Sequence, residues 1–220
     1  MLQKKLIQSL NNNLFKKNYY IFFLIISSFS FTFYYGFIGI FPIDSFLIYD
    51  AGYKVLNGYH PFKDYWSITG PILDYIQFIF FKILGINWFS YVLHAAVFNL
   101  FITIIFFYFF LQLGINSGYS FLYSLSTSIL AYPSVGTPFM DHHAVIFSIA
   151  SGIFIFLAFL KDKPIFWFLV PIFLFASFLS KQIPSAYLLL LFILSILIFW
   201  IFFKTKSYKF LVYISLGSIL

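Results

Sequence analysis

The sequence predicts an all-α protein: a polytopic bundle of six to seven transmembrane helices, with interfacial helices in a large first extracytoplasmic loop. Of the 220 residues, 62% are hydrophobic and only 9% are charged, whereas a soluble domain carries roughly 25% charged residues. Apolar runs of about twenty residues, the length that crosses a bilayer core, recur along the chain. The chain has no cysteine, which excludes disulfides and thiolate metal sites.

The apolar runs predict a single transmembrane domain over residues 1–220. The first span covers residues 19–40, a loop with two surface helices covers residues 41–86, and the remaining spans lie within residues 88–220. The later spans expected there are residues 88–111, 119–135, 144–160, a fifth ending near 180, and 183–203. A seventh begins after Lys209 and stops at Leu220 before it can cross, so we expect a domain that is incomplete at its C-terminus.

The lysines predict the orientation of these spans. The N-terminal lysines precede an apolar run without a small-x-small cleavage site, which indicates an uncleaved anchor. With the N-terminus in the cytoplasm, nine of the thirteen lysines lie inside, as the positive-inside rule requires: Lys4, Lys5, Lys16, Lys17, Lys161, Lys163, Lys204, Lys206 and Lys209. Because the lysines sit at the ends of apolar runs, the net charge of +7 indicates contact with membrane headgroups and no nucleic-acid partner. We expect a multi-pass protein of the bacterial inner membrane.

Residues 44–75 concentrate the polar chemistry, because they hold four of the six acidic residues. Asp44 directly follows the first span. It either caps a helix over residues 45–56, or serves as a general base in the low-dielectric surroundings of the membrane surface. Asp50 and Lys54 have the spacing of a surface ion pair on that helix, which Gly58 would end. A helix over residues 71–84, which carries Asp74, Gln77 and Lys82 on one broad face, is predicted to lie in the membrane interface.

Three further groups are candidates for binding or for structure. Asp64 either forms a loop hydrogen bond, or binds a metal or a sugar hydroxyl. The cluster Asp141-His142-His143 either caps the fourth span or contacts a divalent metal or a phosphate, and a complete metal site would need Asp44 or other groups as well. Lys181 either snorkels to the membrane surface or contacts a phosphate. Within the second span, His94 and Asn99 are predicted to form interhelical hydrogen bonds.

The order Asp44, Gly58, Pro61, Asp64, followed by Gly70-Pro71 and an amphipathic helix ending at Gly85, resembles the first large loop of the C-superfamily membrane glycosyltransferases. Protein O-mannosyltransferases and lipid A aminoarabinose transferases are relatives in that superfamily. An Asp-His motif opening the fourth span and a lysine near the outer end of a later span also match. The resemblance covers most of the chain, as the N-terminal portion of a longer family fold.

The resemblance implies transfer of a sugar from a polyprenyl-phosphate donor to a lipid, glycan or protein acceptor on the extracytoplasmic face. It implies a catalytic role for Asp44, which would act as the general base or position the acceptor. Substrate-binding roles would fall to Asp64, Asp141, His142, His143 and Lys181. No cofactor is certain, and a divalent metal, with Asp44, Asp141 and His142 as possible ligands, stays open. Ser45 and Thr69 depart from the family pattern.

Two readings compete with transfer: a transporter of lipids or polyprenyl-linked sugars, and a non-catalytic membrane fragment. Transporters place their ionisable groups near the middle of the membrane. In the predicted topology the acidic and histidine residues gather instead at one membrane surface, which favours the transferase.

Overall fold

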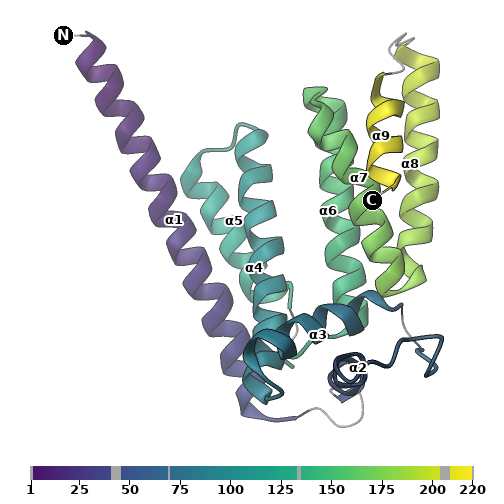
Figure 1. Cartoon of the computed structure of the whole chain (residues 1–220). Coiled ribbons are helices and arrows are strands. Elements are labelled where there is room, and N and C mark those ends of the chain that lie inside the picture. Colours follow the sequence, from purple (N-terminus) through teal and green to yellow (C-terminus); the bar gives the residue numbers. More distant parts are fainter. Residues whose placement is uncertain (1, 41–45, 69, 133–134, 204–208, 220) are drawn as a thin grey trace. The chain divides into compact units, whose positions relative to one another are not determined.

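The computed structural model describes residues 2–40, 46–68, 70–132, 135–203 and 209–219, and in these ranges every named element is an α-helix, as predicted (Figure 1). The helices are α1 (Leu2–Ile38), α2 (Leu47–Leu56), α3 (Ile72–Leu84), α4 (Trp88–Gln112), α5 (Ser117–Leu130), α6 (Met140–Lys161), α7 (Pro164–Ser180), α8 (Gln182–Phe203) and α9 (Lys209–Ile219).

Three described helices are long and apolar enough to cross a membrane: Lys17–Ile38, Trp88–Gln112 and Met140–Lys161. Three more are apolar but shorter: Pro164–Ser180, Gln182–Ile198 and Phe210–Ile219. The helices indicate a membrane protein, but the number of long spans is smaller than the six to seven predicted. The largest difference is the predicted span 119–135, where α5 has only 14 residues and places serines at positions 120, 124 and 128 on its buried side.

The chain forms two compact units, Met1–Ile40 with Ala95–Thr137, and Phe41–His94 with Pro138–Leu220. In the first unit, Asn99 of α4 connects the other two helices. Its side-chain amide donates to Thr32 Oγ1 of α1 at 3.0 Å and to the Ser128 carbonyl of α5 at 2.9 Å. Asn99 therefore forms the interhelical hydrogen bonds that the sequence predicted for it.

In the second unit, serines of α6 and α7 join the two helices. Ser177 Oγ donates to the Ala144 carbonyl at 2.9 Å and lies 2.7 Å from Ser148 Oγ. Ser151 Oγ donates to the Val170 carbonyl at 3.1 Å. Small hydroxyl residues of this kind let apolar helices approach closely.

The two short helices α2 and α3 pack against each other near the start of α6, and α3 also contacts α7 (Figure 1). Gly52 of α2 lies so close to α3 that an added Cβ would meet Gln77 Cγ at 2.6 Å. A buried core joins these two helices to α4 and consists of Ile48 of α2, Leu73 of α3 and Tyr91 of α4. The helix ends follow the sequence signals, since Gly58 and Gly85 both have left-handed φ values, of 85° and 82°.

Candidate functional site

A groove with a volume of about 720 Å³ lies between α2 and the segment that leads into α3. Five aromatic rings and several aliphatic side chains form its wall, and two carboxylates and one lysine provide its charged groups. The lining residues are Phe46, Leu47, Tyr49, Asp50, Ala51, Tyr53, Lys54, Tyr65, Trp66, Ser67, Ile68, Asp74 and Ile86. Mostly apolar walls with a few convergent polar groups are typical of small-molecule sites.

The most buried polar group of the groove is Asp74, whose side chain belongs to the first turn of α3 and is only 1% exposed. The Tyr65 hydroxyl donates a hydrogen bond of 2.7 Å to Asp74 Oδ2. The other carboxylate oxygen, Oδ1, is buried and has no hydrogen-bond partner among the described residues. Half of this carboxylate is therefore satisfied by the protein and half is not.

Burial raises the pKa of Asp74 to about 6, because a desolvated carboxylate disfavours its charged form. The hydrogen bond from Tyr65 and the charge of Lys54 oppose this shift, since both stabilise the anion. The pKa of Tyr65 is raised in turn, mainly by burial and then by its bond to Asp74. A carboxyl group with a pKa near 6 can hold or accept a proton close to neutral pH.

Lys54 is held on the wall of the groove by two interactions. Its Nζ lies 2.7 Å from Asp50 Oδ2, which is the ion pair that the spacing predicted. The same nitrogen lies 5.1 Å from the centre of the Tyr65 ring, within cation–π range. The groove thus contains its own cation over an aromatic face.

Behind Asp74, the next polar residue on the same side of α3 binds a histidine. Gln77 Oε1 lies 2.8 Å from His94 Nδ1, and both side chains are fully buried. The His94 ring lies 4.9 Å from that of His143, whose Nδ1 is 2.9 Å from the Phe139 carbonyl. These contacts join α3, α4 and α6, so His94 forms an interhelical hydrogen bond, as predicted.

Asp141 and Lys181, two predicted site residues 40 positions apart, form an ion pair with each other. The side chains are 44% and 40% exposed respectively, so both remain accessible. The neighbouring Ser180 carbonyl accepts a 3.1 Å hydrogen bond from the Gly70 N–H. An added Cβ on Gly70 would overlap the Leu179 carbonyl, so this position requires glycine. This contact fixes the segment leading into α3 to the end of α7, beside the ion pair.

The other predicted site residues lie in different surroundings. Asp44 falls outside the described residues. Asp64 Oδ2 accepts a 2.8 Å hydrogen bond from the His60 N–H, the loop-stabilising alternative. The His142 ring lies 5.5 Å from that of Phe139, while His143 faces His94. Among the described residues, no group of three His, Asp or Glu side chains could hold a metal ion.

Asp74 was not among the residues that sequence reasoning selected for the site. The pattern had placed Asp74, Gln77 and Lys82 on one broad face of an interfacial helix. In the structure Asp74 and Gln77 are buried, whereas Lys82 is exposed. The available signal was the presence of an acid and an amide in an otherwise apolar helix, which is costly unless the groups have partners or a function.

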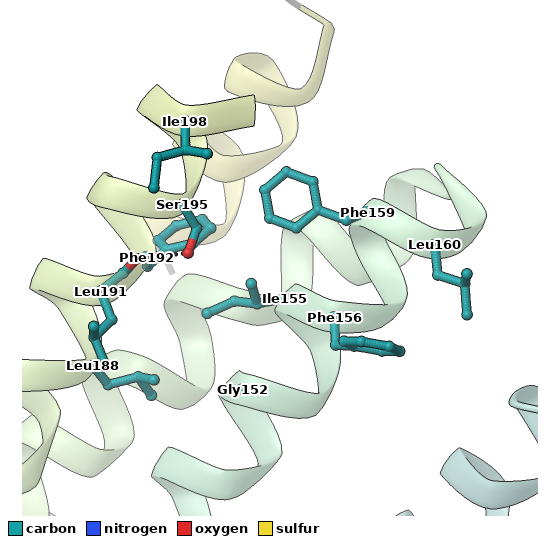
Figure 2. Close-up of a pocket in the computed structure, with 10 residues that line it drawn as sticks. All are labelled: Gly152, Ile155, Phe156, Phe159, Leu160, Leu188, Leu191, Phe192, Ser195 and Ile198. Atoms are coloured by element: carbon teal, nitrogen blue, oxygen red, sulfur yellow. Dashed lines mark hydrogen bonds between the residues drawn. The ribbon is translucent and has the colours of Figure 1, made fainter. Parts of the chain in front are cut away.

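A second cavity, of about 600 Å³, lies between α6 and α8 in the same unit. Ile155 and Phe159 of α6 point across it toward α8 (Figure 2). The polar side chain in its wall is Ser195, whose hydroxyl already donates to the Leu191 carbonyl at 2.7 Å. This crevice therefore offers hydrocarbon contacts.

No protein-family model, curated protein or solved structure matches this chain. Its apolar helices and its groove define a helical membrane protein with a ligand-sized site on two short helices.

Proposed function

We propose that this chain is a polyprenyl-phosphate-dependent membrane glycosyltransferase, or the N-terminal portion of one, acting at the extracytoplasmic surface. The observation that carries the proposal is the groove beside α2, in which aromatic faces, carboxylates and a lysine converge. A sugar has two apolar faces and a rim of hydroxyls, so it is bound by rings together with charged hydrogen-bonding groups.

Transfer requires a base for the acceptor hydroxyl and a positive group for the departing phosphate. We assign the base to Asp44, which precedes the groove-lining residue Phe46 by two positions in the sequence. We assign the phosphate contact to Lys181, which is held by Asp141 but remains partly exposed. The acceptor would be a lipid, a glycan or a protein at the same surface.

The apolar crevice between α6 and α8 supports a lipid-linked substrate. Its wall of leucine, isoleucine and phenylalanine side chains suits a hydrocarbon chain, because burial of apolar area is its main contribution to binding. A soluble sugar nucleotide would have no use for such a surface.

The test incubates membranes carrying the full chain with a panel of polyprenyl-phosphate sugars, with and without a chelator, and follows donor consumption. The wild type should consume one of the donors, and Asp44→Asn should lower the rate at least about 100-fold, as expected for a general base. Asp162→Asn is the matched control, because Asp162 is an acid in the turn after α6, where its left-handed φ of 47° suits asparagine equally well.

Consumption of no donor by the wild type would refute the proposed function. Full activity of Asp44→Asn at normal abundance would refute the assignment of the base. Loss of activity with the chelator would show a divalent metal requirement.

A further inference from the structure

The buried carboxylate of Asp74 has a hydrogen-bonding capacity that the described protein does not use. Asp74 lines the groove, is 1% exposed, and leaves Oδ1 without a partner among the described residues. An unsatisfied buried acceptor costs free energy, and the cost is larger when the acceptor is charged. Such a group is explained most directly by a ligand that donates a hydrogen bond to it.

The charges in the groove narrow the chemistry of that ligand. Rings beside a carboxylate would suit an organic cation, but Lys54 already supplies a cation against Tyr65 and pairs with Asp50. An anionic ligand would meet the carboxylates of Asp50 and Asp74. A neutral ligand whose hydroxyls can donate to Asp74 and accept from the Lys54 ammonium avoids both conflicts.

The aromatic wall fits the same ligand. The Trp66 side chain is 82% exposed, and Phe46 and Tyr53 are each 45% exposed. Exposed rings in the wall of a groove offer flat apolar surfaces to the carbon faces of a sugar ring. The Trp66 ring is supported at its side by Phe62, whose centroid is 6.2 Å away.

We propose that this groove binds a neutral sugar ring, with Asp74 Oδ1 accepting a hydrogen bond from a ring hydroxyl and Trp66 packing against a face of the ring. The inference rests on the proposed function, because it makes the groove the site that binds either the transferred sugar or the sugar of the acceptor. Asp74 then acts by binding, while the base remains Asp44.

The experiment measures binding separately from transfer. The full chain in nanodiscs is titrated with neutral methyl hexosides and methyl pentosides, using saturation-transfer NMR and tryptophan fluorescence. We expect saturable binding of at least one glycoside. Asp74→Asn should weaken it at least about tenfold, because a neutral amide replaces a charged hydrogen-bond acceptor. Asp162→Asn makes the same acid-to-amide change in the turn after α6, outside the groove, and should change affinity less than about threefold.

Trp66→Ala is the second variant, and its exposed position makes misfolding no obstacle. It should weaken binding about five- to tenfold, because it removes the aromatic face against which the sugar ring packs. Equal affinities of wild type and Asp74→Asn, or no binding of any glycoside, would overturn the inference. Binding of choline or inorganic phosphate in place of glycosides would also overturn it.

The outcomes separate this inference from the proposed function. Donor consumption without glycoside binding to the groove would refute the inference and leave the transferase assignment intact. Glycoside binding that depends on Asp74, together with no consumption of any polyprenyl-phosphate sugar, would support the groove as a sugar site and refute the transferase.

Discussion

The hydroxyl of Tyr65 donates a 2.7 Å hydrogen bond to the carboxylate of Asp74, a residue buried to 1% exposure. This bond joins the loop after α2 to the first turn of α3. Tyr65 bonds to one oxygen of the Asp74 carboxylate, and the second oxygen has no partner among the described residues. The shape and the charge of the groove therefore depend on the same contact.

Removal of the Tyr65 hydroxyl should destabilise the protein near neutral pH. Tyr65→Phe leaves a buried carboxylate without its donor, at an expected cost of about 1.5–3 kcal/mol in the free energy of unfolding. Tyr53→Phe is the control, since Tyr53 lines the same groove but is 45% exposed. Thermal unfolding in nanodiscs at pH 7.5 measures both. Equal melting temperatures for the two variants would contradict a structural role of the bond.

The pH dependence of stability follows from the raised pKa of Asp74. Its value of about 6 in the folded protein exceeds the ordinary 3.8, so the neutral carboxyl is the form that the fold favours. Its contribution is complete below pH 3.8 and is lost as the pH rises through 6. Asp74→Asn keeps an acceptor for Tyr65 and cannot ionise, so its stability relative to the wild type should increase between pH 4.5 and 7.5.

The charged and titratable groups facing Asp74 set the midpoint of this transition. The hydrogen bond from Tyr65 and the charge of Lys54 lower the pKa of Asp74. The charge of Asp50 raises the pKa of Tyr65, which keeps the phenol protonated as the donor. Melting temperatures of the wild type and Asp74→Asn, measured across this range, provide the check. A constant difference between the two proteins would show that Asp74 does not titrate there.

Gly70→Ala should release the segment leading into α3 from the end of α7. A Cβ at this position would overlap the Leu179 carbonyl, and backbone cannot yield as a flexible side chain can. The 3.1 Å bond from Gly70 to Ser180 would be lost with it. Limited proteolysis should then cut near residues 62–68 faster than in the wild type. Gly39→Ala is the matched control, because an added Cβ there meets nothing within 4 Å, and unchanged proteolysis of Gly70→Ala would refute the constraint.

The ion pair of Asp141 and Lys181 should matter little for stability and much for activity. Both side chains are about two-fifths exposed, and exposed pairs contribute about 0–1 kcal/mol. Lys181→Gln should therefore change the free energy of unfolding by less than about 1 kcal/mol. If Lys181 contacts the donor phosphate, the same variant should lower transfer at least tenfold, a loss of about 1.4 kcal/mol. A parallel loss of stability and activity would indicate a structural pair instead.

Local signals in the sequence predicted the local structure of the loop. The i,i+4 spacing of Asp50 and Lys54 gave their ion pair, and Gly58 and Gly85 ended their helices. These features depend on residues within a few positions of each other, so they can be predicted without knowing the tertiary structure. For Asp141 and Lys181 the sequence predicted only that both lie at the same membrane surface. Their ion pair could not be predicted, because no helical periodicity connects residues 40 positions apart.

The sequence could not show which face of α3 is buried, and the reason is physical. In a soluble helix, apolar residues mark the buried face, but in a membrane protein both lipid and protein interior are apolar. The polar residues Asp74 and Gln77 were therefore taken for an interfacial face, whereas they point inward to Tyr65 and His94. A similar ambiguity affected residues 119–135, where apolar composition suggested a span but a serine-lined helix of 14 residues forms.

The contact between Gly70 and the end of α7 has a mechanical consequence. Ile68, which lines the groove, lies two positions before Gly70. A displacement of the last turn of α7 is thus carried by one backbone hydrogen bond into the rim of the groove. Because α7 is an apolar helix, we expect a change in bilayer thickness to displace this contact and so to alter the width of the groove.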